Sequence, residues 1–250
     1  MNIVVTGGSG GLGREVVSRL RQRQVRTVAA SRRTGFDLAT GEGVREALAD
    51  ADVVVHAATH PARFRKVDLD GTRRIIRILQ ERPQPPHLVY VSIVGVDHNP
   101  FPYYRAKYAC ELVLERSGLP VTVVRATQFH TLLRNIGQFS ARGPIALVPR
   151  GMAFQSCDNL WVADQLVSLA LADAPLGYRR ASDLAGPERT TFVEVVELAR
   201  QAAGKGRPRL VTLPVVGGAL RSFAAGSNLP GPDATVGGVG YRDWLRAHSA

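Results

Sequence analysis

The sequence predicts an α/β fold, a doubly wound parallel sheet with helices on both faces followed by a small α/β C-terminal part. Short apolar runs of strand length alternate with segments of helical periodicity along the first half of the 250-residue chain. A turn with several glycines joins the first run to the first helical segment. This alternation of strand and helix is typical of a parallel sheet wound on both sides.

The expected strands follow the apolar runs in order. Prolines within residues 83–86 and the tripeptide at residues 118–120 end the helices before two of these runs. Only residues 34–38 are available for a further strand before residue 44, so any strand there is short. The strands are expected at residues 1–5, 25–30, 53–57, 88–92 and 121–124, and the helices between them at residues 12–20, 67–79 and 103–116.

The pattern changes after Arg125. We expect residues 1–125 to form the core and residues 126–250 a smaller contiguous part, within a single domain, that covers the substrate at the carboxyl edge of the sheet. The C-terminal part includes a Gly/Pro-rich segment at residues 137–151. A helix is expected at residues 159–172, a capping box of Thr191 and Glu194 starts another that ends near residue 203, and residues 209–213 favour an extra strand.

The glycine turn has the spacing of a phosphate-binding loop. Gly7 allows a sharp turn off the first strand, Gly10 keeps side chains away from a pyrophosphate, and Gly13 allows the helix to pack closely. The helix N-terminus presents unpaired N–H groups to the anion. An ordinary tight turn is the alternative, but the unit of about 30 residues favours a Rossmann-type dinucleotide site. The expected contacts are Gly7, Ser9, Gly10, Gly11, Leu12 and Gly13.

The end of the second strand indicates which dinucleotide binds. NAD-binding units usually place a carboxylate there to accept hydrogen bonds from the ribose 2′-OH, whereas this chain has Ser31, Arg32 and Arg33. Guanidinium groups suit a 2′-phosphate. The residues therefore favour NADP(H) over NAD(H), the alternative being that both arginines belong to the general Arg excess of the chain.

Two further segments are candidates for cofactor contacts. Asp37 and Leu38 lie where a carboxylate could hold the adenine, although an Asp in a loop is usually solvated or a cap. Ala57, Ala58 and Thr59 follow the run at residues 53–56, where small residues would let the nicotinamide half lie against the backbone. Ordinary packing is the alternative for these alanines.

Tyr103 and Lys107 have the i, i+4 spacing that places them on one face of a helix. A cation near a phenol lowers the pKa of the phenol, which makes it a usable acid near neutrality. The lysine could also bind the nicotinamide ribose. The alternative is that Lys107 only extends along the surface of an amphipathic helix. Neighbouring Tyr104 is expected to be a packing residue.

The chain resembles atypical or extended short-chain dehydrogenases/reductases of the NmrA-like group. The resemblance covers the chain to about residue 172, and the turn at residues 184–188 resembles a turn of that group's C-terminal part. It implies a Rossmann fold, NAD(P)H, a triad in which Ser92 orients a carbonyl and Tyr103 protonates it with support from Lys107, and a homodimer formed through helices at residues 67–82 and 103–117. The motifs are Gly7-x-x-Gly10-x-x-Gly13, His56-Ala57-Ala58, Gly71-Thr72, Val91-Ser92, Tyr103-x-x-x-Lys107 and Arg125-Ala126-Thr127-Gln128-Phe129.

These features leave three hypotheses for function. The first is an NADPH-dependent reductase of a small carbonyl, enone or quinone, with a pocket walled by residues 129–133 and 137–152. Phe129 and His130 would contact the substrate, although a histidine beside Phe129 equally suits a packed core. The second is a non-catalytic redox sensor that binds a protein partner. The third, an epimerase or dehydratase of a nucleotide sugar, is disfavoured by the short C-terminal part.

Composition excludes several other classes. The formal net charge is +11, but only 3 of the 32 basic residues are lysine and the arginines form no dense block, which argues against nucleic-acid binding. No apolar run is long enough to span a membrane. The two cysteines and six histidines have no metal-ligand spacing, so we expect no metal and a cytoplasmic location.

Overall fold

The computed structural model describes residues 1–140 and 144–248, which form two compact units. Unit 1 contains residues 1–92, 102–125 and 162–181, and unit 2 contains residues 93–101, 126–161 and 182–250. The units therefore interleave along the sequence, unlike the two contiguous parts expected at residues 1–125 and 126–250. Among the described residues, no helix is both long and apolar enough to cross a membrane.

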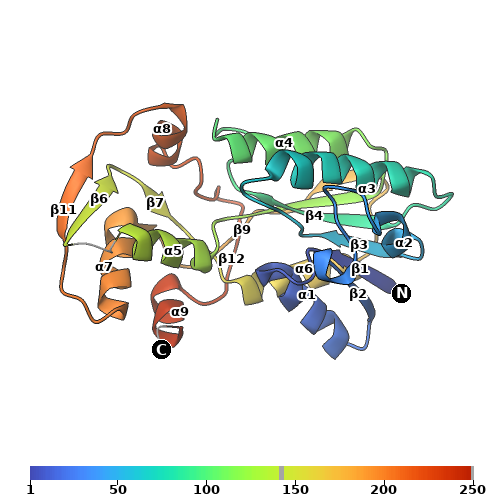
Figure 1. The fold of residues 1–250 in the computed structure, drawn as a ribbon, viewed down its shortest axis with the longest axis horizontal. Coiled ribbons are helices and arrows are strands. Elements are labelled where there is room, and N and C mark those ends of the chain that lie inside the picture. Colours follow the sequence, from blue (N-terminus) through green and yellow to red (C-terminus); the bar gives the residue numbers. More distant parts are fainter. Residues whose placement is uncertain (141–143, 249–250) are drawn as a thin grey trace. The chain divides into compact units, whose positions relative to one another are not determined.

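Unit 1 has the predicted parallel sheet. Its strand order is β2-β1-β3-β4-β5, with β8 also paired to β5 (Figure 1). The apolar runs form these strands because both faces of the sheet are covered, and Ile3, Val4 and Val5 are fully buried. The strands are β1 (Asn2–Thr6), β2 (Arg26–Ala30), β3 (Val53–His56), β4 (His87–Ile93), β5 (Val121–Ala126) and β8 (Tyr178–Arg180).

The strand register aligns the carboxyl ends of the central strands. Thr6 pairs with Ala30 of β2 on one side and with His56 of β3 on the other. His56 in turn pairs with Tyr90 of β4. Because the chain leaves β2 and returns to the sheet on the other side of β1, the strand order reverses between β1 and β3. This reversal is the place where ligands bind in open α/β sheets.

Helices cover both faces of the sheet in unit 1. Helices α1 (Gly11–Gln22) and α6 (Asn159–Leu171) lie on one face, and α3 (Asp70–Gln80) and α4 (Pro102–Glu115) lie on the other (Figure 1). Arg19 Nε of α1 donates to Asp164 Oδ1 of α6 at 2.6 Å, which joins two helices that are far apart in the sequence. The short helix α2 (Val44–Leu48) buries Val44 and Leu48.

The short strand considered at residues 34–38 does not form. The chain makes a 3₁₀ turn, η1 (Arg32–Thr34), and then Gly35 with a φ of 75°. The Thr34 hydroxyl accepts from Ser31 N at 3.0 Å and lies 3.1 Å from Ala29 O, so this side chain holds the backbone in a turn. Phe36 then enters the core instead of extending the sheet.

Unit 2 contains short paired strands and four helices among its described residues. The capping box is confirmed, because Glu194 N donates to Thr191 Oγ1 at 3.2 Å and Thr191 N donates to Glu194 Oε2 at 2.7 Å. The predicted strand at residues 209–213 is also confirmed. The strand pairs are β6 (Ile145–Pro149) with β11 (Arg209–Leu213), β7 (Ala153–Phe154) with β10 (Thr190–Thr191), and β9 (Leu184–Ala185) with β12 (Thr235–Val236); the helices are α5 (His130–Ser140), α7 (Phe192–Ala202), α8 (Gly218–Ala224) and α9 (Tyr241–Ala247).

The Gly/Pro-rich segment at residues 137–151 contains regular structure. Its described residues include the end of α5 and all of β6, whereas residues 141–143 lie outside the described residues. Gly137 is a helical glycine, and a Cβ added there would lie 2.8 Å from Val195 O of α7. This glycine therefore serves close helix packing and not a loop.

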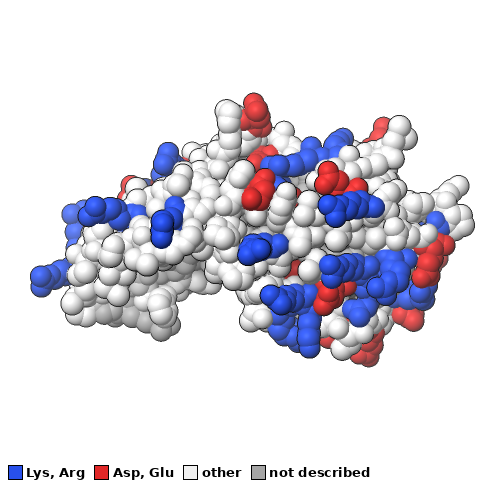
Figure 2. Space-filling model, turned by 90° about the horizontal axis from the view of Figure 1, so that it is seen from above, with Lys and Arg blue, Asp and Glu red and all other residues white. Residues whose placement is uncertain are grey.

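Charged side chains are mixed on the surface. On the face shown in Figure 2, acidic side chains lie among the basic ones. Several of the arginines form ion pairs with nearby carboxylates, such as Arg45 with Glu81 and Arg246 with Asp243. The positive net charge is therefore spread over that face.

Candidate functional site

The glycine turn packs tightly against the segment that follows β3. Gly7 has a φ of 70°, and a Cβ on this residue would lie 2.8 Å from Ala58 Cα and 3.1 Å from Ala57 C. A Cβ on Gly13 would clash with Gly7 O. Gly10 N donates to Gly7 O at 2.8 Å and closes the turn. Gly7 is therefore required by contact as well as by conformation, and Gly13 by contact.

The N-terminus of α1 is open to an anion. No acidic residue lies in the first turn of the helix, and no side chain caps it. Ser9, Gly10 and Gly11 are exposed and Leu12 is half-buried. The N–H groups of the first turn of α1 have no intrahelical acceptor and lie at the positive end of the helix dipole, which suits a phosphate group.

The end of β2 carries cations and a buried hydroxyl. Ser31 is buried, and its Oγ has no hydrogen-bond partner among the described residues. Arg32 and Arg33 are exposed and form no ion pair within the described part of the chain. A buried polar atom without a partner is costly, so Ser31 is a site where a ligand atom would fit.

Asp37 and Leu38 both contribute to the local fold. Asp37 Oδ1 accepts from Ala39 N at 2.8 Å, as in a turn stabilised by its own side chain. Leu38 is buried, and a Cβ added to Gly71 would lie 2.9 Å from Leu38 Cβ. Their predicted contact with an adenine remains a prediction.

A buried hydrogen-bond network holds the end of β3. His56 Nδ1 lies 2.6 Å from Thr6 Oγ1, and its Nε2 lies 3.1 Å from Thr72 Oγ1. Ala58 N donates to the same Thr6 Oγ1 at 3.3 Å. Burial lowers the pKa of His56 to about 3, so this ring is neutral at physiological pH. The network keeps the Ala57–Ala58 backbone in place against Gly7.

Tyr103 lies in a chain of hydrogen bonds at the same edge of unit 1. Its Oη is 2.7 Å from Thr59 Oγ1, and Thr59 Oγ1 donates to Asp68 Oδ1 at 2.6 Å. Asp68 lies in a π-helical turn, η2 (Arg65–Leu69), and its other oxygen accepts from His60 N at 3.1 Å. Tyr103 is therefore tied directly to the segment that contacts the glycine turn.

Lys107 lies on α4 as predicted, but its ammonium group contacts residues other than Tyr103. Its Nζ donates to Val91 O at 2.8 Å, lies 3.9 Å from Asp68 Oδ1 and stands over the Tyr90 ring. Within the described residues it makes no hydrogen bond to Tyr103. Burial, followed by the charge of Asp68, raises the pKa of Tyr103, so the expected lowering of this pKa by Lys107 is wrong.

Ser92 ends the buried part of β4. It is 2% exposed, and no partner for its Oγ is present among the described residues. This hydroxyl could therefore bond a ligand atom without breaking an existing contact, but its predicted role in a triad is untested.

The two predicted substrate residues lie in unit 2. Phe129 is half-buried in a bridge with Cys157. His130 is 1% exposed, its Nδ1 lies 2.8 Å from Ser156 Oγ and its Nε2 lies 2.9 Å from Val239 O. Because both ring nitrogens have protein partners, the structure corresponds to the packed alternative for His130 and not to a substrate contact.

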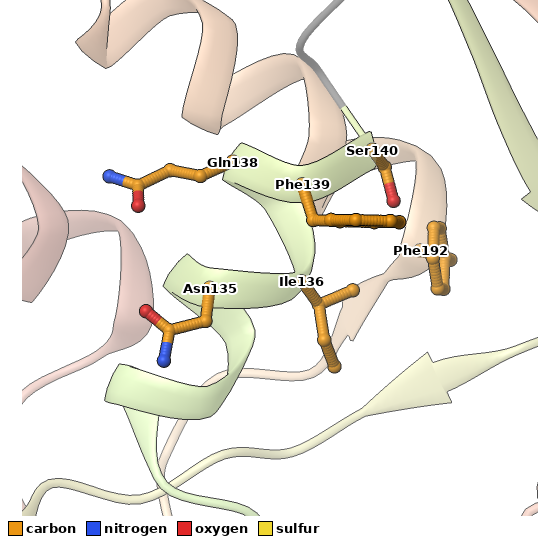
Figure 3. Close-up of a pocket in the computed structure, with 6 residues that line it drawn as sticks. All are labelled: Asn135, Ile136, Gln138, Phe139, Ser140 and Phe192. Atoms are coloured by element: carbon orange, nitrogen blue, oxygen red, sulfur yellow. The ribbon is translucent and has the colours of Figure 1, made fainter.

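A cavity of about 620 Å³ opens on α5 within unit 2 (Figure 3). It combines two phenyl rings with amide and hydroxyl groups and has no titratable side chain in its lining. Three of its residues belong to the predicted pocket wall at residues 137–152, whereas residues 141–143 of that wall lie outside the described residues. The lining residues are Asn135, Ile136, Gln138, Phe139, Ser140 and Phe192.

The fold and the glycine turn together define a dinucleotide-binding α/β protein. A family model described as NAD(P)H-binding matches residues 7–136, which is more than half of the chain. The chain therefore belongs to this NAD(P)H-binding family. The match does not single out the NmrA-like group, so that narrower resemblance remains a prediction. Among curated proteins, none matches the sequence significantly.

Solved structures share the fold over nearly the whole chain. MoeE5 in complex with UDP-glucose and NAD is 17% identical with a TM-score of 0.74, covering 100% of this chain and 97% of its own. UDP-glucose 4-epimerase of Thermus thermophilus, in complex with NAD, is 18% identical with a TM-score of 0.71, covering 100% and 98%. RMD of Pseudomonas aeruginosa, complexed with NADPH, is 18% identical with a TM-score of 0.63, covering 99% and 98%. At these identities the likeness establishes the fold alone.

Sequence reasoning missed Asp68 as a site residue. Asp68, Thr72, Ile76 and Leu79 recur at helical spacing and are all buried. A carboxylate on an otherwise apolar helical face is the signal that could have found it, because a buried carboxylate needs partners.

Proposed function

We propose that the protein is an NADPH-dependent reductase of a small carbonyl, enone or quinone substrate. The observation that carries this proposal is the position of the Tyr103 hydroxyl, 2.7 Å from Thr59 Oγ1 in the segment whose backbone contacts Gly7. This link to the glycine turn supports Tyr103 as the proton donor of the proposed reaction. Buried, unpaired Cys110 and Cys157 support a reducing compartment such as the cytoplasm.

Different residues of unit 1 have different roles in such a reaction. When bound, the nicotinamide supplies a hydride to the substrate carbon. Tyr103 donates a proton to the substrate oxygen, and the free hydroxyl of Ser92 orients that oxygen by a hydrogen bond. Lys107 Nζ lies 3.9 Å from Asp68 Oδ1; burial lowers the pKa of this lysine and the charge of Asp68 opposes that shift. Phe129 in unit 2 remains a predicted substrate contact.

A panel of substrates tests the reaction class. With NADPH, the purified protein should oxidise the cofactor in proportion to the carbonyl, enone or quinone that it reduces, followed by cofactor absorbance and product analysis. UDP-glucose should leave the cofactor unchanged and should not be interconverted. If no compound of the panel is reduced, the reductase proposal fails.

Conversion of a nucleotide sugar is the second candidate function, and two similar solved structures support it. Two of the similar structures contain NAD; one of them is also in complex with UDP-glucose, and the other is a UDP-glucose 4-epimerase. The alignments span 97% and 98% of those chains, which removes the argument that the C-terminal part is too short for this chemistry. Interconversion of UDP-glucose without net consumption of cofactor would select this candidate over the reductase.

The preference for NADPH is proposed from the end of β2. Arg32 and Arg33 are exposed and without ion pairs in the described chain, and the unpartnered Ser31 hydroxyl lies beside them. Two guanidinium groups and a hydroxyl would bind a 2′-phosphate, and no carboxylate is present in this segment to accept from a ribose hydroxyl.

The substitution Arg32→Asp tests this preference. The affinity for NADPH should fall by about tenfold or more, because a charge-assisted hydrogen bond contributes roughly 1.5–3 kcal/mol and a carboxylate would also repel the phosphate. The affinity for NADH should hold or rise, as measured by fluorescence titration of both cofactors. Arg26→Asp makes the same change at the opposite end of β2 and should leave the ratio unchanged. An unchanged ratio in Arg32→Asp would remove the argument for NADPH.

A further inference from the structure

The hydrogen-bond chain from Tyr103 ends on a carboxyl group that lies out of contact with solvent. Thr59 Oγ1 lies between Tyr103 Oη at 2.7 Å and Asp68 Oδ1 at 2.6 Å. The side chain of Asp68 has no exposed surface, whereas Thr59 is exposed. The chain therefore connects a buried acid, through one hydroxyl, to the proposed proton donor.

The direction in which these hydrogen bonds are donated depends on whether Asp68 is protonated. A hydroxyl group carries one hydrogen, so Thr59 can donate to only one of its two neighbours. When Asp68 is ionised, Thr59 donates to it and accepts from Tyr103, whose hydrogen then points inward. When Asp68 is protonated, it donates to Thr59, Thr59 donates to Tyr103, and the Tyr103 hydrogen is free to point outward.

We propose that Asp68 and Thr59 form a proton relay that supplies Tyr103. The inference rests on the proposed function, because it needs Tyr103 to protonate a substrate oxygen. In the step, the O–H bond of Tyr103 breaks as the substrate O–H bond forms, Thr59 passes its proton to Tyr103, and Asp68 passes its proton to Thr59. The phenol and the hydroxyl end the step neutral, and Asp68 ends as a carboxylate. After product release, a proton from water returns to Asp68 along the same chain.

The surroundings of Asp68 suit a group that changes its charge. Burial raises the pKa of Asp68, which favours the protonated form that starts the step. The Lys107 ammonium at 3.9 Å and the bond from His60 N stabilise the carboxylate that ends it. Because burial also raises the pKa of Tyr103, a relay that never requires a free phenolate fits this site better than proton release by Tyr103 alone. The titratable groups whose charges act on Asp68 are Lys107, Tyr103, Cys110, Tyr90 and His60.

A matched pair of variants at Thr59 tests the relay by kinetics. Thr59→Val removes the hydroxyl with little change in shape, and Thr59→Ser keeps it; both should fold, because the residue is exposed. Thr59→Val should lower kcat by about 100-fold with a nearly unchanged KM, since general acid catalysis contributes roughly 10²–10⁴-fold. Thr59→Ser should retain most of the wild-type kcat. The wild type should lose activity as pH rises through the pKa of Asp68, and Asp68→Asn should lose that limb of the profile.

A second measurement needs no turnover. With ¹³Cζ-labelled tyrosine, the NMR resonance of Tyr103 should shift at the pH where Asp68 titrates, because the direction of its hydrogen bond reverses there. This shift should be present in the wild type and in Thr59→Ser and absent in Thr59→Val. Infrared spectra of the protonated carboxyl, assigned with Asp68→Asn, locate the titration of Asp68 independently.

The two measurements separate the relay from the reductase. If no compound of the panel is turned over but the Tyr103 resonance shifts with the titration of Asp68, the proposed reaction is overturned and the hydrogen-bond switch stands. Turnover in which Thr59→Val keeps the wild-type kcat and pH profile would overturn the relay and leave the reductase standing. Absence of the coupled shift in the wild type would overturn the relay by itself.

Discussion

The substitution Tyr103→Phe is expected to lower kcat by about 10²–10⁴-fold, the usual contribution of a general acid, while the affinity for NADPH stays unchanged. The phenylalanine ring keeps the packing of the tyrosine, whose ring centroid lies 6.1 Å from that of Phe64 and 6.5 Å from that of Tyr104. Only the hydroxyl and its bond to Thr59 are lost. Steady-state turnover with the best substrate of the panel, together with fluorescence titration of NADPH, measures both effects.

Tyr108→Phe is the matched control, because it removes a phenolic hydroxyl one turn further along α4. Its activity should match that of the wild type. Should Tyr103→Phe retain wild-type turnover, Tyr103 is not the proton donor and the reductase mechanism is wrong. A protein that has no turnover in either form but binds a protein partner in a cofactor-dependent manner, with or without the hydroxyl, would instead be the redox sensor considered from the sequence.

The strands and the dinucleotide turn could be predicted because their causes are local. Runs such as residues 53–55 are apolar throughout because both faces of a parallel sheet are buried, so composition and length identify them. The requirement for glycine at Gly7 follows from a φ of 70° and from contact with Ala58. In this turn, the spacing of the glycines along the sequence directly determines where they lie in the structure.

The contacts around Tyr103 were less predictable than the strands, because they join segments that are distant in the sequence. The i, i+4 spacing correctly places Tyr103 and Lys107 on one helix, but it does not state where a flexible ammonium goes. The Lys107 amine turns to Val91 O and Asp68, because a buried ammonium requires acceptors and a nearby negative charge. Asp68, from a segment almost 40 residues earlier, was not among the predicted partners.

His130 and the segment at residues 34–38 also depend on contacts that composition does not reveal. The hydrogen-bond partners of His130 are Ser156 and Val239, which only the folded chain brings to it. At residues 34–38, the Thr34 hydroxyl and Gly35 hold a turn that overrides the apolar character of Phe36 and Leu38. Both are cases in which a side chain that bonds the backbone or a distant partner decides the outcome over local composition.

The substitution Gly13→Ala is expected to abolish NADPH binding and to destabilise the protein. The added Cβ would clash with Gly7 O and would lie 2.8 Å from Gly7 C and 3.0 Å from Gly8 Cα. All three are backbone atoms, so the turn itself must shift, whereas a flexible side chain could simply rotate away. Overpacking of this kind costs roughly 1–3 kcal/mol, and the shift also moves the N–H groups that would face the phosphate.

Gly177→Ala is the control that isolates contact from the general effect of adding a methyl group. Apart from its two chain neighbours, no described residue has an atom within 4 Å of a Cβ added at Gly177, so this change should leave stability unaltered or raise it by about 0.4–1 kcal/mol through the unfolded chain. Thermal unfolding should therefore show a loss of stability in Gly13→Ala alone, and NADPH titration should show lost binding in Gly13→Ala and wild-type affinity in Gly177→Ala. If Gly13→Ala bound NADPH with wild-type affinity, the close contact between α1 and the turn would not be what holds the phosphate site, and dinucleotide binding by this turn would need another explanation.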